Sequence, residues 1–293
     1  MAFLSGIALT LVLISDSPPL ERLGRLDYPA IREASGIVAS RRHPGIFWVH
    51  NDSGNLSSLF AVKRNGSLVR EYLVRVPNID WEDIAIDDDG HLYLAEIGNN
   101  DGRLPLRAIH RIVEPDPTQP HQGTLMVEAT SFYRFPPQGR FDAEGLFLDA
   151  GRAVVVAKTF DRQEAELFAI PLHPPAPLLR PAVPESLGRL PQFREPATGA
   201  DLSRDGRHLA VCAVNVARIY QRARSGSWTL VGTVRFQADD VEAIAWDGLD
   251  LILAGENRVI SRISEKGWRN GRDEIAPRPR FRSIERFKTQ PSP

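Results

Sequence analysis

A short, mostly acidic phrase recurs five times along the 293-residue chain, and this repetition limits the possible folds more than any other feature. Successive copies begin 47, 62, 56 and 42 residues apart. The copies occupy residues 33–37, 80–84, 142–146, 198–202 and 240–244. Repeats of this size are typical of solenoids, propellers and arrays.

Each copy opens a predicted β-hairpin. A short apolar run, rich in β-branched and aromatic residues, begins 11 to 14 residues after the first residue of each copy. Such runs indicate strands rather than helices. Turn formers such as Asp89-Gly90, Asp205-Gly206 and Asp247-Gly248 lie between the paired strands, where glycine supplies the positive φ of a tight turn. Further strands follow in most blocks, and four short antiparallel strands per block predict β-propeller blades.

We therefore predict an all-β fold, a β-propeller of five blades. The last block shows only three clear strands, and residues 20–26 alternate apolar and polar side chains, so an N-terminal strand is expected to close the ring. The alternatives are a six-bladed ring, with an additional blade within residues 165–197, and an ordinary β-sandwich. The predicted domains are a signal peptide or leader at 1–17, one propeller at 18–270, and a basic, proline-containing tail at 271–293.

Composition and the apolar start bear on partners and location. The net charge of −1 gives no electrostatic basis for binding nucleic acid. Residues 2–15 are apolar, as in a secretory signal, but shorter than the ~20 residues that span a bilayer. We expect an exported protein, periplasmic or extracellular, with no stable membrane span, and the alternative is a tethered or mis-assigned start. We also expect a monomer that takes a small-molecule ligand or substrate at the propeller mouth.

Carboxylates gather where the repeated strands begin. In a propeller these strand starts, and the ends of the strands that return beside them, converge near one mouth. The residues expected to line the channel there are Glu33, Asp80, Asp83, Asp142, Thr198 and Asp240, beside Glu82, Glu144, Asp201 and Glu242. So many carboxylates require raised pKa values or a bound cation. Oxygen ligands without cysteine or a histidine pair favour Ca²⁺. The alternative is that these acids pair with arginines between blades or hold water.

The five motifs resemble those of the calcium-activated nucleotidases (apyrases), which are five-bladed propellers with a central calcium. The phrases at 33–37, 142–146 and 241–246 are also similar to the SdiA-regulated family and the esterase-like phytase family. The resemblance implies calcium ligands at Ser35, Glu82, Glu144 and Glu242. The fourth copy departs from the pattern because Ala200 has no side-chain oxygen, so Asp201, Thr198 or water would replace it.

Hydrolysis and binding are both open functions for such a site. A metal-assisted hydrolase of phosphoester, phosphoanhydride or ester bonds needs a general base, and the candidates are Asp52, Glu96 and Glu256. Lys158 and His50 are the candidates for facing developing negative charge. No glycine-rich phosphate loop or Gly-x-Ser-x-Gly elbow is present. The alternatives are a non-catalytic binding module with a structural calcium, and a lactonase or phytase-like enzyme on a six-bladed ring.

Overall fold

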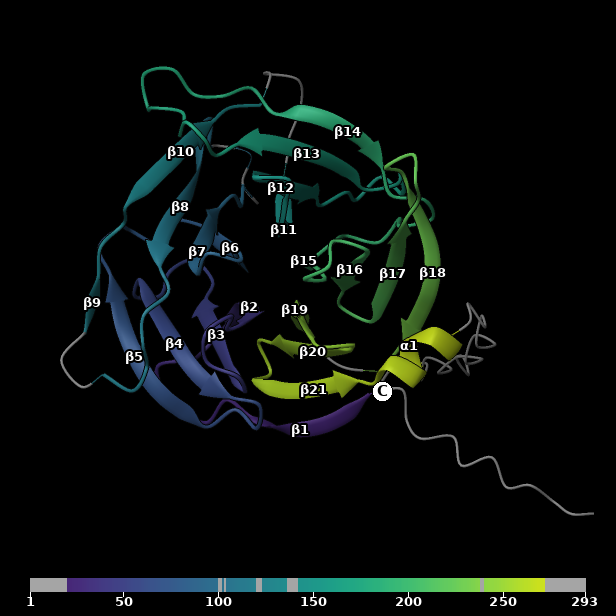
Figure 1. Ribbon diagram of the computed structural model, residues 1–293, viewed down its shortest axis with the longest axis horizontal. Helices are drawn as coiled ribbons and strands as arrows, with labels where there is room; N and C mark the ends of the chain where they lie inside the picture. The colour runs from purple at the N-terminus through teal and green to yellow at the C-terminus, as the bar shows by residue number, and fades with distance from the viewer. Residues whose placement is uncertain are drawn as a thin grey trace, which may run out of the picture.

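Five β-sheets are arranged in a ring in the computed structural model (Figure 1), which describes residues 20–99, 102, 104–119, 123–135, 142–237 and 240–271. The innermost strands of the five sheets contact one another in a closed circle. These strands are β2 (Ala34–Ala39), β6 (Trp81–Ile86), β11 (Ala143–Asp149), β15 (Gly199–Leu202) and β19 (Val241–Asp247). The prediction of an all-β, five-bladed propeller is therefore confirmed.

Three further strands complete each of the first four blades. The first blade adds β3 (Ile46–Asn51), β4 (Ser58–Lys63) and β5 (Leu68–Val74), and the second adds β7 (His91–Glu96), β8 (Arg107–Val113) and β10 (Ala129–Tyr133). The third adds β12 (Arg152–Ala157), β13 (Glu166–Pro171) and β14 (Glu185–Arg189), and the fourth adds β16 (His208–Ala213), β17 (Val216–Arg222) and β18 (Trp228–Arg235). The chain between β8 and β10 also supplies β9 (Thr124–Leu125), which pairs in parallel with β5.

The fifth blade joins the two ends of the described chain. It contains β19, β20 (Asp250–Gly255), β21 (Val259–Ile263) and, at its outer edge, β1 (Glu21–Arg25), which runs antiparallel to β21. Figure 1 shows β1 and β21, from the two ends of the colour scale, side by side on the rim. The predicted closure by an N-terminal strand is thus confirmed. Residues 165–197, the place considered for a sixth blade, instead hold β13 and β14 of the third blade.

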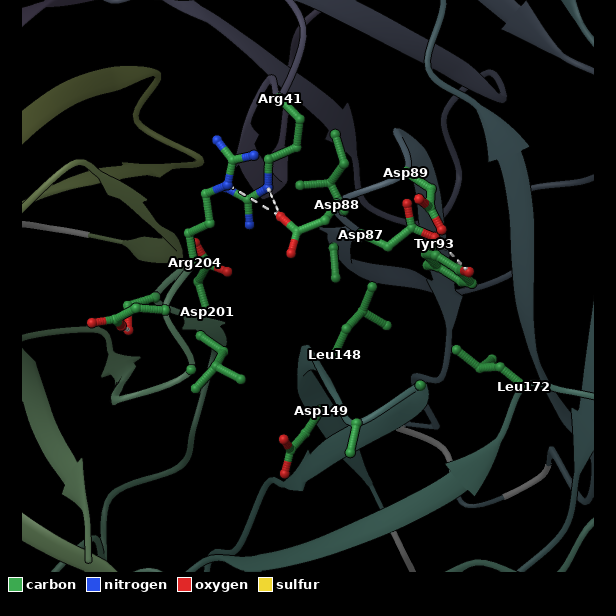
Figure 2. A pocket seen from close by; sticks show the side chains of 18 of the residues that line it. Arg41, Asp87, Asp88, Asp89, Tyr93, Leu148, Asp149, Leu172, Asp201 and Arg204 are labelled. Atoms are coloured by element: carbon green, nitrogen blue, oxygen red, sulfur yellow. Dashed lines mark hydrogen bonds and ion pairs between the residues drawn. The ribbon is translucent and has the colours of Figure 1, made fainter.

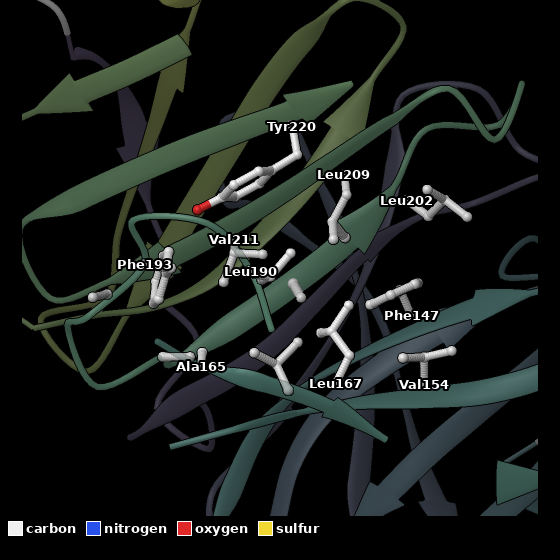
Figure 3. Close-up of a cluster of buried hydrophobic side chains, with 14 of the residues drawn as sticks. Phe147, Val154, Ala165, Leu167, Leu190, Phe193, Leu202, Leu209, Val211 and Tyr220 are labelled. Atoms are coloured by element: carbon white, nitrogen blue, oxygen red, sulfur yellow. The ribbon is translucent and has the colours of Figure 1, made fainter. Parts of the chain in front are cut away.

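Five apolar clusters hold the ring together, one between each pair of neighbouring blades. The cluster between the third and fourth blades packs Phe147, Val154 and Leu167 against Leu209 and Tyr220 (Figure 3). The inner two strands of the first three blades are mostly buried on both faces because each face packs on a neighbour, and the burial of their apolar side chains supplies the main stabilising term. The inner strands are therefore fixed closely enough to position side chains at the axis.

A short helix, α1 (Glu265–Asn270), follows the last strand and packs on β18. The predicted leader at 1–17 and the predicted tail beyond Gly271 lie outside the described residues. Within the described ranges, no helix has the length and apolar character needed to cross a bilayer.

Candidate metal centre

The inner hairpins of four blades share an irregularity at one position. The ladder between the first and second strands shifts register as it passes Ser35, Glu82, Glu144 and Glu242. A bulge of this kind takes one residue out of the alternation of the strand and turns its side chain in a new direction. The fourth blade pairs β15 with β16 in unbroken register from Gly199 to Leu202, and Ala200 stands at the corresponding position. The register shift thus occurs in the four blades whose repeated motif has a side-chain oxygen at this position, and it does not occur in the fourth blade, where the residue is alanine.

The four bulged residues line one cavity of about 140 Å³ at the mouth formed by the strand starts. The side chains that complete its wall are Glu33, Ala34, Asp52, Lys158 and Glu256. Six of the nine lining residues are carboxylic acids and one is a lysine. The sequence therefore predicted most of this wall, and the structure brings the residues together.

Glu82 and Glu144 are the least exposed acids of the cavity wall, at 3% each. The Oε1 of Glu82 has no hydrogen-bond partner among the described residues. Carboxylate oxygens of Asp52, Asp80 and Glu82 all lie within 4.8 Å of one another. Burial, then the charges of Glu144, Asp52 and Asp80, raise the pKa of Glu82 well above its ordinary value. An unpaired buried oxygen among acids is the condition in which a cation would be most stabilising.

Glycine at position 98 makes room for these acids. A Cβ at Gly98 would lie 2.0 Å from Glu82 Oε1 and 2.6 Å from Asp80 Oδ2, closer than atoms can approach. Gly98 follows β7, and its backbone N–H donates to the carbonyl of Asp80. The sequence carries no signal for this role of Gly98, because only the pairing of β6 with β7 brings the residue against the acids.

The cavity wall also contains an ion pair. Lys158 Nζ contacts Glu144 Oε1, and both side chains are largely buried. Burial nevertheless raises the pKa of Glu144 to about 8 and that of Glu242 to about 7. Lys158 opposes both shifts, while neighbouring acids add to them.

Three residues predicted to line the channel instead connect blades. Asp83 is fully buried and accepts backbone N–H groups from Ile84 at 2.8 Å, Leu146 at 2.8 Å and Ala200 at 3.1 Å. Asp142 accepts the N–H of Asn99 at 2.8 Å, which joins the second and third blades. The hydroxyl of Thr198 donates to the carbonyl of Val241 at 3.0 Å. None of the three lines the 140 Å³ cavity, because these hydrogen bonds hold the side chains between the inner strands.

The candidate bases divide into two groups. Asp52 and Glu256 line the cavity, and burial raises the pKa of both. Glu96 lies outside the cavity wall, where its two oxygens accept the N–H groups of Ile79 and Asp80 and thereby fix the start of β6. Asp240 is exposed with a positive φ of 66°, and its side chain is also outside the wall.

His50 is buried in the core rather than placed at the mouth. Its Nδ1 lies 2.9 Å from the carbonyl of Asn51, and its ring meets that of Trp81 edge-on at 5.6 Å. Burial lowers its pKa to about 4, so it is neutral near pH 7. The expectation that His50 faces developing charge is therefore wrong, because strand alternation at the end of β3 turns its ring inward.

Asp201 lies near the opposite end of the inner strands, in a second cavity of about 490 Å³ among the hairpin turns (Figure 2). Its Oδ2 accepts the N–H of Trp246 at 2.8 Å, which ties the fourth blade to the fifth. Figure 2 also shows Arg41 and Arg204 turned toward Asp88, with Arg204 Nε at 3.2 Å from its carboxylate. Because β15 has no bulge, Asp201 keeps its place in the strand and does not reach the wall of the 140 Å³ cavity.

Comparisons with known proteins add nothing to the chemistry. No known protein family and no curated protein matches the chain. Among solved structures, it is similar to the β-propeller domain of Myceliophteria thermophila Cps50 (Swd1), with 13% identity and a TM-score of 0.39 over 83% of this chain and 68% of that one. It is also similar to a luciferin-regenerating enzyme, with 10% identity and a TM-score of 0.49 over 85% of this chain and 95% of that one. At these scores neither similarity bears on the cavity.

Proposed function

We propose that this propeller binds Ca²⁺ in the 140 Å³ cavity and uses it to hydrolyse phosphoester, phosphoanhydride or ester bonds. The observation that carries the proposal is the coincidence of four bulges with the four oxygen-bearing side chains that meet there. Bulges next to functional sites commonly aim a side chain, whereas packing alone does not require one at the same offset in four blades.

The donors present suit a hard divalent cation. Ser35, Glu82, Glu144 and Glu242 would hold it, with Asp52 and Asp80 close enough to Glu82 to supply further oxygens. Among the described residues, no cysteine or histidine lines the cavity. Ca²⁺ accepts 6–8 oxygen ligands in flexible geometry, which suits side chains drawn from separate blades. The unpaired Oε1 of Glu82 supplies an independent reason for a ligand at this place.

The chemistry would divide between the ion and the protein. A bound calcium supplies Lewis acidity, polarising a phosphoryl or acyl oxygen. Asp52 and Glu256 are the wall carboxylates placed to accept a proton from water, since neither is engaged in an ion pair among the described residues. Glu96 acts as a positioning residue, because it holds the N–H groups of Ile79 and Asp80 and so orients the acids that begin β6.

The test is a hydrolysis screen with saturating calcium and with chelator. The resemblance of the repeated motifs to calcium-activated nucleotidases and esterase-like phytases selects the panel: nucleotides, phosphomonoesters and lactones. We expect calcium-dependent turnover that Glu82→Gln lowers by at least about 100-fold. Glu185→Gln, on the exposed outer strand β14, is the matched control and should leave turnover unchanged.

The non-catalytic binding module makes a different prediction. There, Glu82→Gln removes calcium-dependent stabilisation, yet no member of the panel is cleaved by the unaltered protein. If the protein binds calcium but cleaves no compound of the panel, the hydrolase hypothesis is therefore rejected and the cation site is retained.

A further inference from the structure

Lys158 is the one basic residue in the cavity wall of the described chain. It follows β12, and its backbone N–H donates to the carbonyl of Asp142 at 2.9 Å, which fixes the base of the side chain. Its side chain is 17% exposed, and that of its partner Glu144 is 5% exposed. An ammonium group thus occupies the place where the proposed calcium would have to meet Glu144.

The ammonium group has a second contact outside the carboxylates. Lys158 Nζ lies 5.7 Å from the ring centre of Phe160, which is 71% exposed. A cation over an aromatic face is attracted to it, so this ring offers the lysine a position toward solvent. The side chain can exchange one partner for the other without moving its backbone, because a lysine stem has several rotatable bonds.

We propose that Lys158 is an internal counter-ion of Glu144, which a divalent cation displaces on entering the cavity. This inference rests on the proposed function and concerns the selectivity of its cation site. In the ion-free protein the lysine partly neutralises the wall. A monovalent ion would replace one positive charge by another and gain little, whereas a divalent ion adds a net charge among the acids. Lys158 therefore sets a threshold that favours divalent ions and, once displaced, is free to meet an anionic substrate oxygen.

Calorimetric titration of CaCl₂ into metal-free protein tests the competition. We expect Lys158→Met to bind calcium at least about tenfold more tightly than the unaltered protein, because the competing charge is gone. Lys158→Arg keeps the charge and should stay within about threefold of the unaltered protein. Lys63→Met changes an exposed lysine of β4 by the same substitution and should have no effect.

Reductive methylation followed by peptide mass spectrometry tests the displacement in the unaltered protein. Lys158 should react at least about fivefold faster with saturating calcium than with chelator, since its ammonium group leaves Glu144 for a more exposed position. Lys63 provides the internal control, with a rate that calcium does not change. This measurement also decides the matter if Lys158→Met does not fold.

The outcomes separate the two proposals. The counter-ion role of Lys158 is overturned if Lys158→Met binds calcium no more tightly than the unaltered protein. It is also overturned if calcium does not alter the reactivity of Lys158. Either result leaves the proposed cation site unaffected. If Lys158→Met binds calcium and the unaltered protein does not, the result supports the counter-ion role of Lys158. Calcium would then have no part in the function of the unaltered protein. Binding by neither protein overturns both.

Discussion

Replacing Glu82 by glutamine should have opposite effects on stability in chelator and in calcium. With chelator, the substitution removes a buried carboxylate that has an oxygen within 4.8 Å of carboxylate oxygens of Asp52 and Asp80. Two unit charges at that distance repel by about 3 kcal/mol at an effective dielectric constant of 20, and protonation relieves part of this. We therefore expect the free energy of unfolding to rise by about 1–3 kcal/mol in Glu82→Gln.

With saturating calcium, the same substitution should lower stability relative to the unaltered protein. A ligand that binds only the folded state stabilises it by about 2.7 kcal/mol at a concentration 100 times its Kd, and Glu82→Gln should lose most of this. For a chain of this size, each kcal/mol shifts Tm by about 2–4 °C.

The assay is thermal unfolding followed by circular dichroism, with chelator and with calcium, on both proteins at pH 8. The diagnostic result is a crossing: the variant melts higher in chelator and lower in calcium. If Glu82→Gln destabilised the protein equally in both conditions, Glu82 would be an ordinary packing residue and the reasoning would be refuted.

Three further predictions follow from the same geometry. Burial and neighbouring acids raise the pKa of Glu144 to about 8 and that of Glu242 from 4.5 to about 7, so the folded, ion-free protein binds more protons than the unfolded chain above pH 4.5. Its stability should therefore fall by about 6 kcal/mol as pH rises from 5 to 8 in chelator, and denaturant titrations showing a flat or rising stability would contradict this. Gly98→Ala should weaken calcium binding by at least about tenfold in calorimetry, because the added carbon collides with the cavity acids, whereas Gly123→Ala, which meets open space, should not. Asp83→Ala should cost at least about 3 kcal/mol with and without calcium, because it leaves three buried N–H groups unpaired, and an effect confined to calcium would assign Asp83 to the site instead.

Local turn chemistry explains why the fold could be predicted from the sequence. Gly90 and Gly206 have φ values of 83° and 69°, as the Asp-Gly turns required, and each turn returns an apolar strand to its partner. The spacing of these hairpins determined the number of blades. The extra strand β9 was missed because two residues between proline-rich segments carry no periodic pattern.

The site was predicted less completely, since its geometry depends on pairing between strands. The sequence identifies Ser35, Glu82, Glu144 and Glu242 as equivalent, but the register shifts that turn them into the cavity exist only in the paired hairpins. Asp201 directly follows Ala200, which is the position equivalent to these residues. Because its hairpin lacks the register shift, Asp201 instead lines the 490 Å³ cavity among the hairpin turns.

The interactions of individual charges were also beyond the sequence. The contact of Lys158 with Glu144 depends on the end of β12 returning beside the start of β11. The convergence of Arg41 and Arg204 on Asp88 joins turns from three blades. The first arrangement arises from the pairing of β11 with β12 inside one blade, and the second from closure of the ring, which brings together turns that are far apart in the sequence.

The most direct test of the central claim is a crystal structure of the protein soaked in CaCl₂, with anomalous differences collected to locate the ion. We expect one peak inside the 140 Å³ cavity, about 2.3–2.6 Å from carboxylate oxygens of Glu82, Glu144 and Glu242. A fully soaked crystal with no peak there, and with Glu82 Oε1 bonded only to water, would contradict it.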